Sequence, residues 1–160
     1  MARFSQGDLA QSFQQANSNI AGAGLWLCCG GTGPGDITIA LYDLLPNAGG
    51  TLLAQGTDLG VPGSGFAQVF WSPLAVVPDT TYYLVFTSSD SSLGLAGDVS
   101  NPYPRGQVYA NAGYGSFPFY DYTFETYAQV GGGVPEPATL ALTAFGLAGV
   151  LALSRRRRTA

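Results

Sequence analysis

The stretch Asp36-Ile37-Thr38-Ile39-Ala40-Leu41-Tyr42-Asp43-Leu44 alternates between apolar and mixed positions. In an extended chain, Ile37, Ile39 and Leu41 fall on one face and the residues between them on the other. A period of two over this length predicts a β-strand with one face in a core.

Seven further candidate strands, separated by turns rich in glycine and proline, occur on both sides of this stretch. They are residues 9–13, 20–28, 52–59, 66–71, 82–87, 107–111 and 120–127. Pro73 is expected at a strand end or in a bulge, and residues 88–100 read as a polar loop. We therefore predict an all-β fold: a single antiparallel β-sandwich or jelly roll of about eight strands, occupying residues 1–130.

The C-terminal part has a different character. Val134, Pro135, Glu136 and Pro137 form a stiff, extended segment. Residues 138–153 carry no charge and would make about 24 Å of helix, so we predict a transmembrane helix over residues 138–154. The cluster Arg155, Arg156, Arg157 and Arg158 follows directly, which places the C-terminus in the cytoplasm and the rest of the chain outside.

The order of Pro-Glu-Pro, an apolar span and a terminal arginine cluster resembles the PEP-CTERM sorting signal. The resemblance implies an exported protein of a Gram-negative bacterium, with an exosortase as its partner. It also implies a transient anchor in the inner membrane, processing near Pro-Glu-Pro, and a final location at the cell surface or outside the cell. The alternative is an ordinary tail anchor in which Pro-Glu-Pro only interrupts the helix.

The body resembles the choice-of-anchor β-sandwich modules of bacterial surface proteins. The resemblance rests on residues 9–13, 36–43, 50–54 and 78–85, and it covers roughly residues 9–128. Gly131-Gly132-Gly133 reads as a short linker between this body and a sorting signal over residues 134–160. Residues 1–8 lack the apolar core of a secretory signal peptide. We therefore expect that residues upstream of Met1 are missing or that the assigned start of translation is internal. The alternative is a non-functional or tail-anchored protein.

Charge and composition narrow the function. Before Val134, two basic residues stand against nine acidic ones, a formal charge of −7, which argues against nucleic-acid binding. The chain has no histidine and no lysine, which excludes histidine-dependent triads and a phosphate-binding loop that ends in lysine. Asp121 and Glu125 are the pair to consider for a glycosidase, but four residues along one strand separate their backbones by about 13 Å. We therefore predict a protein that is not an enzyme.

Cofactors are expected to be absent, with a calcium site as the remaining option. Asp36, Asp43 and Asp121 could bind Ca²⁺ together with backbone carbonyls, although they lack the spacing of a calcium loop. Adjacent Cys28 and Cys29 are expected to point to opposite faces, with one thiol packed and the other exposed. The alternatives are a strained vicinal disulfide and an intermolecular cross-link.

The segment between residues 103 and 124 has the highest density of aromatic residues. Tyr122 and Phe124 alternate inward and are expected in the core. Others lie in expected loops, where they could stack on sugar rings or simply pack over the edge of the sandwich. The candidates for glycan binding are Tyr103, Arg105, Tyr114 and Phe117.

These observations predict an exported, non-enzymatic surface or matrix protein that an exosortase sorts through its tail. Its role would be structural or glycan-associating in the envelope or biofilm matrix, with exopolysaccharide as a candidate partner. The alternatives are a membrane-anchored carbohydrate-active enzyme and an unprocessed single-span surface protein.

Overall fold

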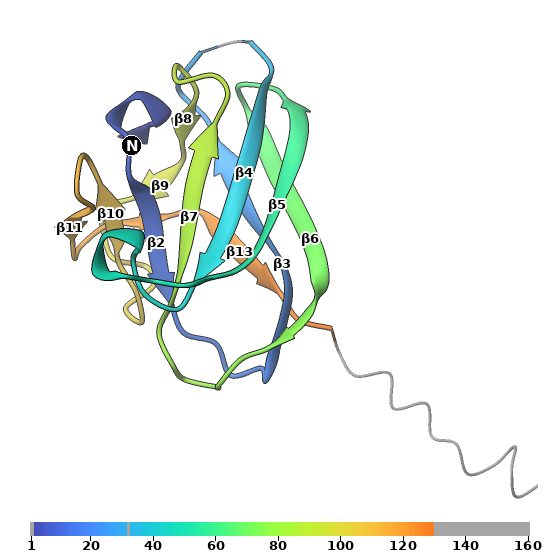
Figure 1. Cartoon of the computed structure of the whole chain (residues 1–160). Helices are drawn as coiled ribbons and strands as arrows, with labels where there is room; N and C mark the ends of the chain where they lie inside the picture. Colours follow the sequence, from blue (N-terminus) through green and yellow to red (C-terminus); the bar gives the residue numbers. More distant parts are fainter. Residues whose placement is uncertain (1, 32, 130–160) are drawn as a thin grey trace, which may run out of the picture. The chain divides into compact units, whose positions relative to one another are not determined.

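The computed structural model describes residues 2–31 and 33–129, which form two large antiparallel sheets and one small one. The two large sheets pack face to face, so the body is a β-sandwich (Figure 1). The predicted linker at residues 131–133, the sorting signal and the helix at residues 138–154 lie outside the described residues. Within the described ranges, no helix is both long and apolar enough to cross a membrane.

One large sheet has six strands. In spatial order they are β11 (Gly115–Phe117), β10 (Val108–Ala110), β2 (Leu9–Phe13), β7 (Tyr82–Ser88), β4 (Gly35–Tyr42) and β5 (Leu52–Val61). The strand predicted at residues 36–44 is β4, and it pairs with β7 on one side and β5 on the other.

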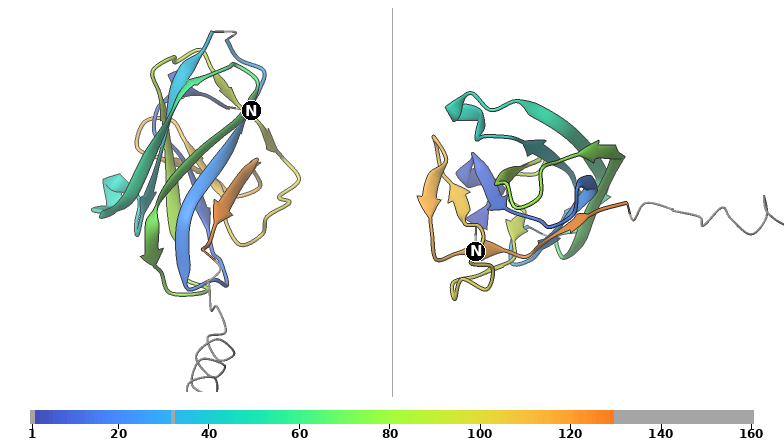
Figure 2. Two further views of the ribbon diagram at one scale, coloured as in Figure 1. Left: turned by 90° about the vertical axis from the view of Figure 1, so that its right-hand side faces the viewer. Right: turned by 90° about the horizontal axis from the view of Figure 1, so that it is seen from below.

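The other large sheet is built around β3 (Asn19–Leu27). β6 (Gly65–Ala75) pairs along one side of β3 and β13 (Phe124–Tyr127) along the other, as the left view of Figure 2 shows. β8 (Gly94–Leu95) meets β3 at Leu27 and carries β1 (Ala2–Arg3) at the edge. The small sheet pairs β9 (Gly97–Asp98) with β12 (Asp121–Tyr122).

Alternation along the strands produces the core between the two large sheets. Ile37, Ile39 and Leu41 of β4 are fully buried, as their spacing predicts. From the opposite sheet, Leu25 and Leu27 join the same cluster. Burial of these side chains supplies the main favourable free energy of folding, at roughly 1.5–3 kcal/mol for each.

Two short helical turns complete the body, η1 (Phe4–Gln6) and η2 (Pro46–Ala48). η1 places Phe4 in the core, while none of the residues of η2 is buried.

Seven of the eight predicted runs each contain a single strand of the structure, but several predictions need correction. The structure has thirteen strands among the described residues instead of about eight, because β1, β8, β9 and β11 are too short to show a period and because the run at residues 120–127 is divided into β12 and β13. Residues 88–100 contain β8 and β9 rather than only a loop, and Phe117 lies in β11 rather than in a loop. Pro73 does lie where the register of β6 shifts against β3, as expected for a bulge.

Residues 120–127 do not form one strand. The chain changes partners at Thr123, whose N–H donates to the carbonyl of Ala96 and whose carbonyl accepts the N–H of Trp26. Before this point β12 pairs with β9, and after it β13 pairs with β3. The break separates Asp121 from Glu125, which the sequence places on one continuous strand.

Candidate functional site

Tyr103 and Arg105, two of the predicted glycan-binding residues, are held by contacts within the body. The Tyr103 hydroxyl donates to the carbonyl of Gln14 and accepts the N–H of the same residue. Its ring lies edge-on to Phe124, with 5.4 Å between the ring centroids. Arg105 pairs with the carboxylate of Asp79. The Tyr103 ring therefore packs over the edge of the sandwich, the more ordinary of its two expected roles.

Tyr114 and Phe117 lie in two different places. Tyr114 sits in a turn with a positive φ of 56° and packs on the outer face of the six-stranded sheet, against the cluster of Ala10, Ala40 and Val85. Burial raises the pKa of its hydroxyl. Phe117 packs against the main core from β11. The four predicted residues thus do not share one surface.

Asp121 and Glu125 are also in unlike environments. Asp121 is 2% exposed, and both of its carboxylate oxygens accept hydrogen bonds, from Gln11 and from the backbone of Tyr103. Glu125 is exposed on β13, where it accepts a hydrogen bond from the Tyr127 hydroxyl. A buried, fully engaged carboxylate and an exposed one do not form the facing pair that glycoside hydrolysis uses.

The three aspartates considered for calcium are engaged separately. Asp36 accepts the N–H of Gly60 at 2.9 Å, and Asp43 accepts the N–H of Thr51 at 2.6 Å. The Thr51 hydrogen bond also lowers the pKa of Asp43. The part of the chain that the structure describes contains no group of three or more acidic or cysteine side chains able to hold a metal ion.

Cys28 and Cys29 follow the end of β3. Cys28 is half-buried and Cys29 is exposed with a φ of 61°, in line with the expectation for adjacent residues. The two are not joined by a disulfide. A hydrogen bond that the Cys28 thiol makes to the Cys29 side chain, together with burial, raises the pKa of that thiol, which makes it a poor nucleophile at neutral pH.

A cluster of aromatic side chains that was not among the predicted sites lies on the outer face of the sheet around β3. It consists of Trp26, Phe66, Phe70 and Tyr127, and we call it the aromatic face. Trp26 is 43% exposed and Phe70 is 66% exposed. Ring centroids lie 5.8 Å apart for Trp26 and Phe66 and 5.1 Å apart for Phe70 and Tyr127.

Glycines on the central strand form the floor of this face. Gly22 is paired with Phe70, and a Cβ on Gly22 would lie 2.9 Å from Cδ1 of that ring. A Cβ on Gly24 would collide with the ring of Phe66. The absence of side chains at Gly22 and Gly24 therefore lets the rings of Phe66 and Phe70 lie low over the sheet.

Polar groups border the rings. The Gln68 amide donates to the Tyr127 hydroxyl at 2.6 Å, and that hydroxyl donates to Glu125 Oε2 at 2.9 Å. Burial is the main cause of the raised pKa of Tyr127, and Glu125 adds to it. Aromatic faces beside amide, hydroxyl and carboxylate groups, with no positive charge, suit a neutral ligand that has both C–H faces and hydroxyls.

A local signal for this face is present in the sequence. Gly22, Gly24 and Trp26 alternate along one strand, and Phe66 and Phe70 share a face of another. The pairing of these two strands, which the local pattern does not specify, is what brings the residues together.

Comparison with known protein families gives a match in the C-terminal tail. Residues 133–158 match the family described as the PEP-CTERM protein-sorting motif. No curated protein and no solved structure matches the chain. The match covers Val134 to Pro137 and Arg155 to Arg158, all outside the described residues. The chain thus carries a PEP-CTERM sorting motif, which supports exosortase-dependent sorting of a surface protein through the membrane.

Proposed function

We propose that this chain is a non-enzymatic protein which an exosortase delivers to the envelope or the extracellular matrix, and whose body associates there with polysaccharide. The sorting motif at residues 133–158 supports the delivery. The aromatic face supports the association. The kinship of the body to choice-of-anchor modules is part of this proposal and rests on the pattern of its strands.

The aromatic face favours a polysaccharide over other ligands for three reasons. Exposure of apolar rings to water is unfavourable, and the C–H faces of sugars can stack on such rings and cover them. The neighbouring Gln68, Glu125 and Tyr127 offer hydrogen bonds to hydroxyls. The charge of −7 before Val134 disfavours polyanions, so we propose a neutral or weakly charged polymer.

Sorting is tested by the mass of the mature protein. In host cells with an active exosortase, the C-terminal arginine cluster should be lost, and in an exosortase deletion strain it should remain. Glu136→Gln should slow the loss if the exosortase reads the glutamate. Glu125→Gln is the matched control, because Glu125 and Glu136 are the two glutamates of the chain and Glu125 lies in the body. An intact tail in exosortase-positive cells would instead support an unprocessed single-span protein.

Polysaccharide binding is tested with the full chain in mild detergent, by co-sedimentation with the host's insoluble polysaccharide. Phe70→Ala should weaken retention by up to about tenfold, because stacking on one aromatic ring is worth about 0.5–1.5 kcal/mol. Phe119→Ala is the matched control, since Phe119 is 68% exposed and Phe70 is 66% exposed. Equal retention of both variants and the parent protein would contradict the role of the aromatic face.

Two outcomes would favour other functions. Release of reducing sugars that Asp121→Asn abolishes would make the protein a carbohydrate-active enzyme. A dimer in sedimentation velocity that Phe70→Ala dissociates would make the aromatic face an interface between two copies of the chain.

A further inference from the structure

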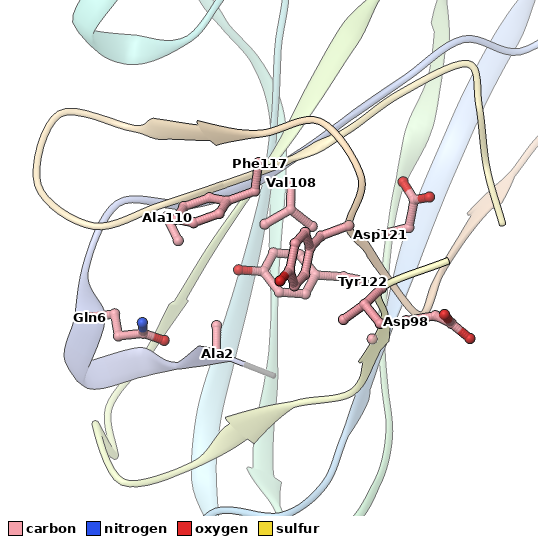
Figure 3. A pocket seen from close by; sticks show the side chains of 11 residues that line it. Ala2, Gln6, Asp98, Val108, Ala110, Phe117, Asp121 and Tyr122 are labelled. Carbon is pink, nitrogen blue, oxygen red and sulfur yellow. The ribbon is translucent and has the colours of Figure 1, made fainter. Parts of the chain in front are cut away.

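A second surface feature lies away from the aromatic face. It is a pocket of about 90 Å³ between the N-terminal segment, the β9 loop, and the chain from β10 to β12 (Figure 3). Its walls are mainly apolar and include Ala2, Val108, Ala110 and Phe117. In Figure 3 the Tyr122 ring lies at the centre, between Val108 and Ala2. We call this feature the Tyr122 pocket.

The hydroxyl of Tyr122 lacks a hydrogen bond. Tyr122 is 5% exposed, and its oxygen is buried with no hydrogen-bond partner among the residues that the structure describes. Burial raises the pKa of this hydroxyl, so it stays protonated and can donate. A buried polar group without a partner is unfavourable, so a ligand that offers an acceptor here gains a hydrogen bond and relieves that cost.

Charge around the pocket excludes most ionic ligands. Asp121 is turned toward Gln11 and the backbone of Tyr103, and the Oδ1 atom of Asp98 accepts two hydrogen bonds from Ser100. In Figure 3 both carboxylates lie away from the Tyr122 ring. The eleven lining residues include no arginine, so an anion finds no counter-charge. A small neutral group remains.

We propose that the Tyr122 pocket binds the acetyl group of an acetylated sugar. The methyl group would pack against Ala2, Val108 and Ala110, and the carbonyl oxygen would accept the hydrogen of the Tyr122 hydroxyl. The volume of about 90 Å³ suits a group of a few atoms, which leaves the sugar ring at the mouth. There the ring would meet Tyr120, which lies edge-on to Phe117 at 5.9 Å.

N-acetyl and O-acetyl groups both combine a methyl group with a carbonyl acceptor. A plain hexose has neither a methyl group to pack against the apolar wall nor a carbonyl acceptor. That the acetyl group is carried by a sugar rests on the proposed association with polysaccharide. Binding in the Tyr122 pocket does not depend on sorting by the tail.

The test measures binding to the full chain in mild detergent by isothermal titration and by saturation transfer to the acetyl methyl group. N-acetylglucosamine and 3-O-acetylglucose are the two acetylated probes, and glucose is the control. We expect the acetylated sugars to bind more tightly than glucose. Binding of one acetylated probe and not the other identifies the source of the acetyl group.

Tyr122→Phe keeps the ring and removes the donor, so it should weaken binding of the acetylated probe by about tenfold. Tyr83→Phe is the control, because Tyr83 contacts Tyr109 and does not line the pocket. Ala110→Val, which reduces the volume, should also abolish binding. Equal affinity for glucose and N-acetylglucosamine, or no effect of Tyr122→Phe, would overturn the proposal. So would a crystal structure grown with N-acetylglucosamine in which only water contacts the Tyr122 oxygen.

The two sites can fail separately. If Phe70→Ala loses polysaccharide but no acetylated sugar binds, the pocket proposal is wrong and the proposed function stands. If N-acetylglucosamine binds and polysaccharide is not retained, the pocket is supported and the role of the aromatic face is wrong.

Discussion

Gln11 and Asp121 are hydrogen-bonded to each other inside the sandwich, with 2.8 Å between Nε2 and Oδ1. Both side chains are buried. The amide oxygen of Gln11 accepts the N–H of Tyr122 at 2.9 Å, and Asp121 Oδ2 accepts the N–H of Tyr103 at 2.9 Å. Gln11 on β2 thus holds β12 in place, Asp121 in turn holds the segment before β10, and the Tyr122 pocket depends on that arrangement.

Gln11→Met should lower the free energy of unfolding by about 2–3 kcal/mol. Methionine has a similar length but cannot donate, so the buried Asp121 carboxylate loses a charge-assisted hydrogen bond and the N–H of Tyr122 loses its acceptor. Urea unfolding followed by tryptophan fluorescence measures the change. Gln55→Met, at an exposed position of β5, is the control and should stay within about 0.5 kcal/mol. A loss at Gln11 no larger than this would show that the network contributes little.

Tyr122→Phe should leave stability at neutral pH unchanged or raise it by up to about 1 kcal/mol. The substitution removes a buried hydroxyl that has no partner among the described residues, so nothing is lost in the unliganded protein. Tyr103→Phe removes a hydroxyl that bonds twice to Gln14 and should cost about 1–2 kcal/mol. The same urea experiment compares the two variants, and an equal loss in both would mean that the Tyr122 hydroxyl has a partner in solution.

Stability should fall as the pH rises above about 10, where tyrosines ionise in the unfolded chain. Burial raises the pKa of Tyr122 in the folded state, so above this pH the folded chain holds a proton that the unfolded chain releases. The stabilising effect is complete below pH 10 and is lost as the pH rises further, by at most about 1.4 kcal/mol per pH unit for one group. Tyr122→Phe should reduce this slope in urea titrations between pH 9 and 11. Some slope should remain, because the pKa values of Tyr83, Tyr114 and Tyr127 are also raised.

The main strands could be predicted because a period of two is a local property. Residues 36–44 show it, and they correspond to β4. β8 and β9 have two residues each, so they have no period, and they are defined by their pairing with distant strands: β8 with β1 and with Leu27 of β3, and β9 with β12. The break at Thr123 also depends on distant partners, namely Trp26 and Ala96.

The surface sites were less predictable, for the same reason. Exposure of Tyr103 was expected from its position between prolines, yet its hydroxyl and ring find partners in Gln14 and Phe124. Conversely, Phe70 looks like an ordinary strand residue until its pairing with Gly22 is known. Phe117 was expected at a glycan site, and it lines the Tyr122 pocket, but that pocket also needs Ala2 from the other end of the chain.

Gly24 and Gly106 are crowded by different kinds of neighbour. A Cβ at Gly24 meets the ring of Phe66, which is partly exposed and can move. A Cβ at Gly106 meets the backbone carbonyl of Ser12, which is fixed because Ser12 pairs with Tyr83 in the six-stranded sheet. Gly24→Ala should therefore change the free energy of unfolding by less than about 1 kcal/mol, while Gly106→Ala should cost about 3 kcal/mol.

For polysaccharide retention the order of the two variants should be reversed: Gly24→Ala should have the larger effect and Gly106→Ala the smaller. Moving the Phe66 ring disturbs its contact with Trp26, so Gly24→Ala should shift tryptophan emission and weaken polysaccharide retention, although the fold is intact. Gly106→Ala should leave retention unchanged below its unfolding transition, because Gly106 does not contact the aromatic face. Fluorescence and co-sedimentation on the same samples check both statements. If Gly24→Ala retained polysaccharide like the parent protein while its emission shifted, the low position of the Phe66 ring would matter for packing and not for binding.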